Sequence, residues 1–383
     1  MRSMLSIFLF VTLLSTFSYS EIPTEDITAV REKVLAGSGS VSASDKAVID
    51  KFIRSAIDAM FLTDDSAEIA QIRHQIRTQK GDKDLSMFAS TYLTSVREYL
   101  RTAFEAVERI QNPEKKTNVI RNIVILTAEL KSLMLAEFGL NYLQSSDIIT
   151  RYWAVKAVVS SSIVDQMNTD ITNIPETTTL IYEAIEPMVL TVKNPEIQRL
   201  LIEYAGGWND ERAVGMLAEI AGRRIEAYQN WTVDNEWLEI PVLKALAGKY
   251  QILQLQTDKT RMARLFAELY AMVIQRWMLG QEVLNDAQKQ DLVSVMVEID
   301  QSVISDLGLS AGRIKSILER GSGLDREFDD LFGTATRQGE LSRKLRFNYG
   351  QADGRAVTSP PKLTPPPADL STQTAADTEA SGG

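Results

Sequence analysis

Helical periodicity runs through almost the whole chain, and it limits the possible folds more than any other feature. From Thr24 onward apolar residues recur at intervals of three and four, as in "SASDKAVIDKFIRSAIDAMFL" at residues 42–62. This spacing places the apolar side chains on one face of an α-helix. No stretch of the first half alternates polar and apolar residues long enough to form a sheet. The sequence therefore predicts an all-α protein.

Residues typical of helix ends divide this pattern into elements. Asp64 or Asp65 precedes a helix that Gly81 follows, as N-cap and C-cap residues do. Another helix is expected to open at Pro113, because proline fits the first helical turn. From about Ser145 the helices become shorter and begin to resemble one another. We therefore expect an N-terminal α-helical region at 21–144 and a region of similar helices at 145–346.

The segment "DIITRYWAVKAV" at residues 147–158 shows how these later helices could pack. In a helix, Ile148, Tyr152 and Val155 share one face. Ala154 and Ala157 leave a shallow stripe where the backbone of a second helix can come close. The segment is therefore expected to stack against another helix.

A similar segment, "NPEIQRLLIEYA", follows at residues 194–205, and it aligns Ala157 with Ala205, 48 residues later. Ala245, in the next such helix, lies 40 residues further on. Intervals of roughly 40–47 residues are typical of two-helix solenoid repeats. In these segments the chain resembles HEAT or armadillo repeats over about residues 145–250. The resemblance implies a helical bundle leading into an α-solenoid, a curved scaffold that binds other macromolecules, and it implies no catalytic residues.

The first twenty residues, "MRSMLSIFLFVTLLSTFSYS", combine a positive charge at Arg2, an apolar run and small residues at the end. This pattern predicts a secretory signal peptide at 1–20, cleaved after Ser20. The alternative is an uncleaved membrane anchor, although the run is shorter than the ~20 residues that span a bilayer. After cleavage no transmembrane segment is expected. We expect a bacterial protein that is secreted across the inner membrane and is periplasmic or extracellular.

The residue types that carry most catalytic chemistry are scarce. The chain has no cysteine and a single histidine, His74, which lies between arginines in "IRHQIR" on an expected helix surface. Disulfides, thiolate metal sites and a cysteine nucleophile are therefore excluded. Glycines do not gather into a phosphate-binding loop. We expect no catalytic, cofactor-binding or metal-ligating residues, and no cofactor.

Charge and composition favour binding to a protein. The formal net charge is −10 and the charged residues, 24% of the chain, are mixed along it. Nucleic acid is not expected as a partner, because a basic stripe is missing. The leading hypothesis is an exported, non-enzymatic helical scaffold that binds a protein partner in the cell envelope. The alternatives are a helical-ring enzyme or lectin acting on envelope polysaccharide through a carboxylate pair, and a structural bundle within a larger assembly.

Aromatic residues and arginines gather in one part of the repeat-like region. On a solvent-facing groove such side chains could anchor a peptide or stack on a sugar ring. The alternative is that they fill gaps between successive helices. The candidate partner-binding residues are Tyr204, Trp208, Arg223, Arg224, Trp231 and Trp237.

The composition changes after about Tyr349. The last residues, "SPPKLTPPPADLSTQTAADTEASGG" at 359–383, contain few apolar side chains and many Pro, Ser, Thr and Ala. Such a segment buries too little surface to offset the entropy lost on ordering. We expect a disordered tail at 347–383, which serves as a spacer, as a ligand for a proline-binding module, or simply as a solvated terminus.

Overall fold

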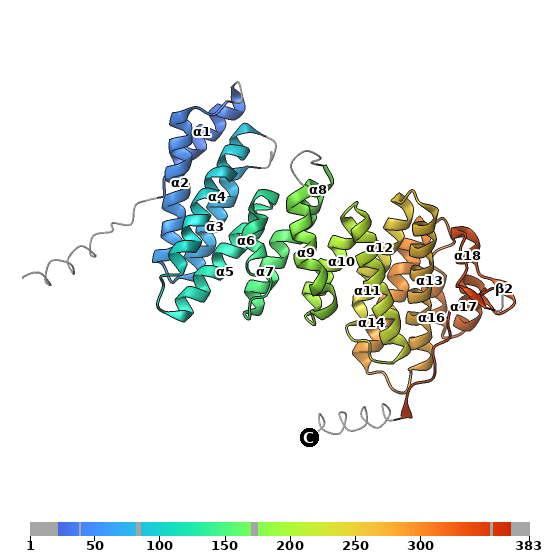
Figure 1. Cartoon of the computed structure of the whole chain (residues 1–383). Coiled ribbons are helices and arrows are strands. Elements are labelled where there is room, and N and C mark those ends of the chain that lie inside the picture. Colours follow the sequence, from blue (N-terminus) through green and yellow to red (C-terminus); the bar gives the residue numbers. More distant parts are fainter. Residues whose placement is uncertain (1–21, 38–39, 82–85, 170–174, 353–354, 369–383) are drawn as a thin grey trace, which may run out of the picture. The chain divides into compact units, whose positions relative to one another are not determined.

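The computed structural model describes residues 22–37, 40–81, 86–169, 175–352 and 355–368, and it is all-α as predicted (Figure 1). The expected signal peptide at 1–20 lies outside the described residues. The described chain divides into two compact units, and the division falls between Val158 and Val159. None of the described helices is both long enough and apolar enough to cross a bilayer.

The first unit is a bundle in which α2 packs against three other helices, α1, α3 and α4, while α5 packs against α3, α4 and α6. Its core includes Phe52, Ile53 and Tyr92, whose side chains are fully buried. The Tyr92 hydroxyl donates a 2.7 Å hydrogen bond to the Ile76 carbonyl, so the buried polar atom is satisfied. The elements are α1 (Thr24–Ala36), α2 (Ala43–Leu62), α3 (Ser66–Lys80), α4 (Met87–Val107), α5 (Pro113–Leu130), the 3₁₀ turn η1 (Leu133–Leu135), α6 (Ala136–Leu140) and α7 (Ile148–Val159).

The helix ends in this unit follow the sequence. Asp65 caps α3 by accepting hydrogen bonds from the backbone N–H groups of Ala67 and Glu68. Gly81 ends the same helix at φ +77°, a conformation that glycine adopts without strain. Pro113 is the first residue of α5, and Asn112 caps it. The predictions for both helices are confirmed.

The small-residue stripe of α7 receives another helix, as expected. Ala154 and Ala157 are buried, and Gly139 of α6 lies against them. A Cβ atom at Gly139 would be 2.9 Å from the Ala154 carbonyl oxygen and 3.0 Å from the Ala157 Cβ. Only glycine allows this approach. The helix at 148–159, which we expected to open the repeat-like region, ends at the boundary between the two units.

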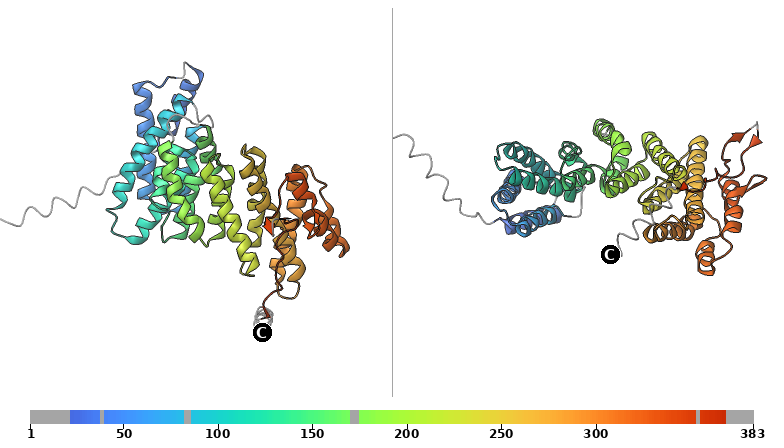
Figure 2. Two further views of the ribbon diagram at one scale, coloured as in Figure 1. Left: turned by 45° about the vertical axis from the view of Figure 1, so that its right-hand side comes forward. Right: turned by 90° about the horizontal axis from the view of Figure 1, so that it is seen from below.

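The second unit begins with helices that each pack against the next one and the next but one: α10 packs on α11 and α12, and α11 on α12 and α13. This stacking is compatible with a helical repeat fold. In Figure 2 the view from below looks down many of the helix axes. The elements are α8 (Ser161–Thr169), α9 (Pro175–Thr191), α10 (Pro195–Gly207), α11 (Glu211–Gln229), the 3₁₀ turn η2 (Glu236–Leu238), α12 (Glu239–Ile252), α13 (Gln256–Leu279), α14 (Asp286–Glu298), the π-helical turn η3 (Ile299–Val303), α15 (Ile304–Asp306), α16 (Arg313–Arg320), α17 (Leu324–Phe332) and α18 (Glu340–Leu345).

Short hairpins and an extended segment complete this unit. The strands β1 (Gly333–Thr334) and β2 (Arg337–Gln338) pair antiparallel, as do β3 (Gln351–Ala352) and β4 (Arg355–Ala356). The disordered tail predicted at 347–383 was placed to begin too early in the chain. Phe347, Tyr349 and Leu363 are buried, because the parts of the chain that carry them pack against the helices. The rest of the predicted tail, 369–383, lies outside the described residues.

A matched pair of glycine substitutions tests the close helix packing. A Cβ at Gly206 of α10 would lie 2.7 Å from the Ala245 Cβ of α12, whereas a Cβ at Gly215 of α11 meets nothing within 4 Å. We expect Gly215→Ala to raise the free energy of unfolding by about 0.5–1 kcal/mol, because alanine is the better helix former. Gly206→Ala should be less stable than Gly215→Ala by about 1–3 kcal/mol, because the helices must move apart. Urea denaturation of both variants measures this, and equal stabilities would contradict the close contact.

Candidate partner-binding pocket

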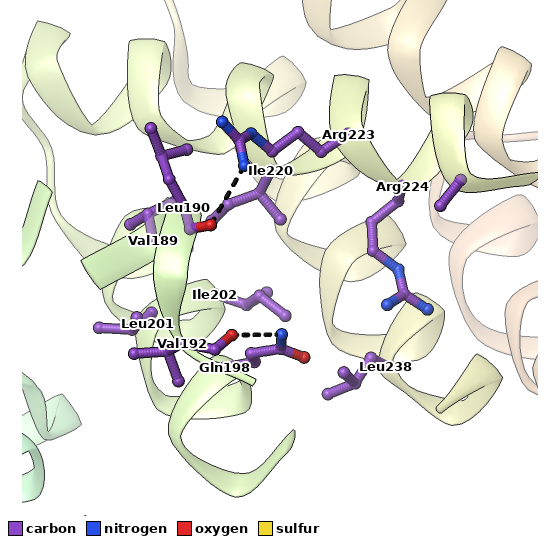
Figure 3. A pocket seen from close by; sticks show the side chains of 11 residues that line it. Val189, Leu190, Val192, Gln198, Leu201, Ile202, Ile220, Arg223, Arg224 and Leu238 are labelled. Atoms are coloured by element: carbon purple, nitrogen blue, oxygen red, sulfur yellow. Dashed lines mark hydrogen bonds between the residues drawn. The ribbon is translucent and has the colours of Figure 1, made fainter. Parts of the chain in front are cut away.

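An apolar pocket of about 200 Å³ lies in the second unit, where α9, α10, α11 and η2 meet (Figure 3). Eight aliphatic residues and three polar side chains form its walls. The lining residues are Val189, Leu190, Val192, Gln198, Leu201, Ile202, Ile220, Arg223, Arg224, Ala227 and Leu238. Leu201, Ile202 and Leu238 form the buried floor, whereas Leu190 remains 37% exposed. The pocket is therefore open to solvent on the side of α9.

Two side-chain hydrogen bonds fix the end of α9 that forms this open side. The Arg223 guanidinium donates a 3.2 Å bond to the Leu190 carbonyl, one of the last carbonyls of α9. The Gln198 amide nitrogen donates a 2.8 Å bond to the Val192 carbonyl. Both carbonyls would otherwise lack a partner within the helix. The pocket wall is thus held by the same residues that supply its polar groups.

Gln198 brings an unpaired hydrogen-bond acceptor to the pocket. Its nitrogen must face the Val192 carbonyl, so its Oε1 atom is turned away from that bond, as Figure 3 shows. This oxygen is buried and has no hydrogen-bond partner. A buried acceptor without a donor is costly, so a ligand N–H group would gain a hydrogen bond here once the Gln198 amide turns its oxygen toward the pocket.

The two arginines differ in the charge that they leave available. Arg224 forms a bidentate pair with the fully buried Glu239, with N–O distances of 2.6 and 2.8 Å. Burial disfavours the cation, but Glu239 more than offsets this effect and the pKa of Arg224 lies above its usual value. Arg223 is half exposed, and its ion pair to Glu219 is long, at 3.9 Å. Arg223 is therefore the lining residue whose positive charge a ligand carboxylate can neutralise.

The structure buries three of the four aromatic candidates. Tyr204, Trp208 and Trp231 are all at most 6% exposed, whereas Trp237 is partly exposed. Tyr204 and Trp208 fill a gap between helices, whereas the Trp231 indole N–H donates a hydrogen bond to the Thr364 carbonyl. Only Arg223 and Arg224 of the six candidates line the pocket.

Tyr204 and Trp208 belong to a cluster that joins α10 to its neighbours. Their rings stack with centroids 5.5 Å apart, and the Arg212 guanidinium lies 4.7 Å from the Trp208 ring. On the other side the buried Lys249 ammonium donates a hydrogen bond to the Trp208 carbonyl. Desolvation lowers the pKa of Lys249 to about 8, although nearby Asp210 acts in the opposite direction. Both Tyr204 and Trp208 are buried, so the cluster is an interior contact and neither ring face is open to solvent.

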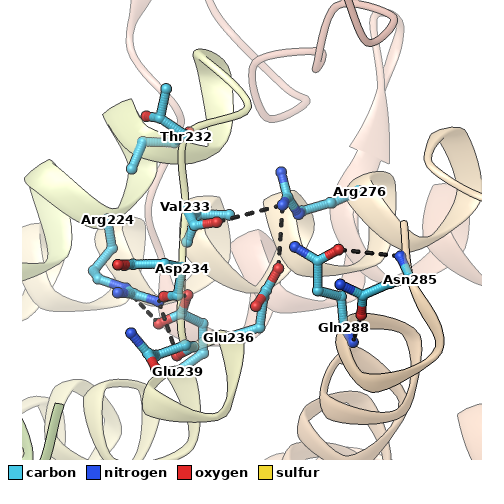
Figure 4. Close-up of polar contacts among 11 residues, drawn as sticks. Arg224, Thr232, Val233, Asp234, Glu236, Glu239, Arg276, Asn285 and Gln288 are labelled. Carbon is cyan, nitrogen blue, oxygen red and sulfur yellow. Dashed lines mark hydrogen bonds and ion pairs between the residues drawn. The ribbon is translucent and has the colours of Figure 1, made fainter. Parts of the chain in front are cut away.

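Trp231 and Trp237 lie near two buried ion pairs, Arg224–Glu239 and Arg276–Glu236, which Figure 4 shows side by side. The Arg276 guanidinium lies 5.1 Å from the Trp231 ring and 5.8 Å from the Tyr228 ring. These faces cover nitrogen atoms of Arg276 that have no hydrogen-bond partner. The tryptophans could be singled out from the sequence but the ion pairs could not, because the partners in each pair are separated by 15 and 40 residues.

A larger cavity of about 810 Å³ lies in the first unit beside the start of α5. It is polar, and three of its four charged lining residues are already paired, since Lys115 contacts Asp64 at 3.3 Å and Arg121 contacts Asp147 at 3.1 Å. Neither cavity combines two acids with two aromatic residues. In the described part of the chain, no three or more acidic or histidine side chains are grouped so that they could hold a metal ion.

Comparison with protein-family models, with curated proteins and with solved structures finds no match to this chain. The fold is a set of packed helices that is compatible with a helical repeat.

Lys249 supplies a prediction about pH. Its pKa is lowered to about 8 in the folded chain from 10.5, so between these values the unfolded chain binds more protons and stability rises with pH. Relative to Lys249→Met, the wild type should gain roughly 2 kcal/mol in unfolding free energy between pH 7 and pH 9.5. Urea denaturation at both pH values measures the difference. Lys315→Met, at an exposed lysine, serves as the control and should show no such gain; parallel behaviour of both variants would refute the burial effect.

Proposed function

We propose that this protein is an exported helical scaffold that binds a protein partner, and that the pocket between α9, α10 and α11 receives an apolar side chain of that partner. The bound segment carries a carboxylate close to the apolar side chain, which pairs with Arg223. The observation that carries the proposal is the combination, in one open pocket, of aliphatic walls, an unpaired Gln198 oxygen and the exposed Arg223 cation.

The size of the pocket favours a side chain over a cofactor. Its volume of about 200 Å³ lies below the roughly 300–1,000 Å³ of pockets that hold small molecules. An anchor residue inserted into a preformed pocket is, by contrast, the usual centre of a protein–protein interface. The pocket therefore suits one large aliphatic or aromatic side chain.

The polar groups favour a peptide over a sugar. A peptide backbone offers N–H groups, from which the Gln198 Oε1 atom can accept a hydrogen bond once its amide turns toward the pocket, and an acidic residue or C-terminal carboxylate suits Arg223. A sugar ring would place hydroxyl groups against aliphatic walls that cannot bind them, which costs free energy. No observation in the pocket favours the polysaccharide-binding alternative.

Charge reversal at Arg223 tests the proposal. A photo-crosslinking amino acid at the partly exposed Leu190 should capture, in living cells, a protein whose crosslinked segment holds an apolar residue within a few positions of a carboxylate. With that segment as a labelled peptide, Arg223→Glu should weaken binding at least tenfold, because attraction becomes repulsion. The matched control is Arg326→Glu, at a 91% exposed arginine of α17, which should change binding less than twofold.

Two results would overturn the proposal. One is a crosslinked segment without an apolar residue next to a carboxylate. The other is a segment that binds Arg223→Glu as tightly as it binds the wild type, while the circular dichroism spectra show both proteins folded.

The proposed location outside the inner membrane rests on residues 1–20. Cleavage after Ser20 would leave Glu21 as the first residue. We expect the protein from the periplasmic fraction or the culture medium of expressing bacteria to begin at Glu21 when its N-terminus is sequenced. A protein that retains Met1 and stays with the membrane fraction would instead indicate an uncleaved anchor.

A further inference from the structure

The residues 359–367, "SPPKLTPPP", form an extended segment that we call the C-terminal strap. Along it, Pro360 and Leu363 are buried and Pro366 is partly buried, whereas the residues between them are exposed. This interval of three is the repeat of a polyproline II helix, which has three residues per turn. The strap therefore presents every third side chain to the protein, which is the spacing expected of one face of such a helix.

The surface beneath the strap contacts its backbone with side chains from the turn after α11 and from α13. The Trp231 indole N–H, after the end of α11, donates a 2.9 Å hydrogen bond to the Thr364 carbonyl. The Gln275 amide of α13 donates a 3.1 Å bond to the Pro361 carbonyl and accepts a 2.9 Å bond from the Leu363 N–H. One side chain thus satisfies a donor and an acceptor of the same short backbone stretch.

The Trp231 indole is held in place by unusual local structure. Its backbone has φ +57°, a left-handed conformation that is strained for a bulky residue. The Arg276 guanidinium lies against its ring. Figure 4 shows the hydrogen bonds that Arg276 donates to the Val233 carbonyl and to Glu236. Backbone strain of this kind persists only where the surrounding contacts hold the residue in place, and strained residues are frequent at binding sites.

We propose that Trp231 and Gln275 form a recognition site for extended proline-rich segments, in which the strap is the resident ligand. A proline-rich segment of another protein, with an apolar residue three positions after a proline, binds there when the strap is displaced. An aromatic N–H donor beside an apolar groove is how proline-rich ligands are commonly bound, since their preformed helix loses little entropy. This proposal is independent of the pocket at Arg223.

The resident strap competes with any external segment, because a tethered ligand has an effective concentration in the millimolar range. The wild-type protein should therefore bind a free peptide weakly. Replacing the buried Leu363 by aspartate places a charge in an apolar contact, which should release the strap and open the site.

The test uses the full chain and a fluorescein-labelled peptide of residues 357–368, with binding measured by fluorescence anisotropy. The Leu363→Asp protein should bind the peptide saturably and at least tenfold more tightly than the wild type. Added to Leu363→Asp, Trp231→Phe removes the indole donor and Gln275→Ala removes the amide, and each should weaken binding at least fivefold. Gln290→Ala, at an exposed glutamine of α14, should change binding less than twofold.

The proposal is overturned if Leu363→Asp keeps the helical circular dichroism spectrum of the wild type but binds no peptide. It is also overturned if binding is unaffected by both Trp231→Phe and Gln275→Ala. Should Leu363→Asp fail to fold, Leu363→Ala carries the same comparison, because it removes most of the buried strap contact without introducing a charge.

Discussion

The second unit depends on close packing between helices that cannot bury their own apolar faces. Gly206 allows α10 to approach Ala245 of α12, and α11 packs on both α10 and α12. Each helix is therefore held by the next one and the next but one, which keeps the ends of α9 and α10 at a fixed spacing. The aliphatic pocket forms at these ends, where side chains line the space but do not fill it.

The turn between α11 and η2 is held by two arginines, the buried Arg276 and the mostly buried Arg224. Arg224 donates hydrogen bonds to the Asp234 and Asn235 carbonyls, and Arg276 donates to the Val233 carbonyl. Their partners Glu239 and Glu236 are buried, and desolvation raises the pKa of Glu236. Buried ion pairs of this kind contribute little net stability, because desolvation offsets the attraction. Their evident effect is geometric: they hold the turn that carries Trp231.

The sequence was sufficient for the fold class and for local features. Asp65, Gly81 and Pro113 mark helix ends through interactions with nearby residues, and Ala154 and Ala157 form their stripe by helical spacing alone. The exposure of the tryptophans could not be predicted in the same way, because it depends on which helices pack above them. The pocket was missed for a related reason, since Gln198 and Arg223 meet only through the end of α9.

The strap shows where composition misleads. Few apolar residues indicate that a segment gains little from burial, and for residues 359–367 that inference predicted disorder. The entropy lost on ordering, however, is smaller for a chain already restricted by five prolines, at 360, 361 and 365–367. Three backbone hydrogen bonds to Trp231 and Gln275 and the burial of Leu363 then suffice to hold it. Prolines leave the segment with few apolar side chains, which predicts disorder, but they also lower the entropy lost on ordering. The burial of Pro360 and Leu363, three residues apart, favours the ordered state.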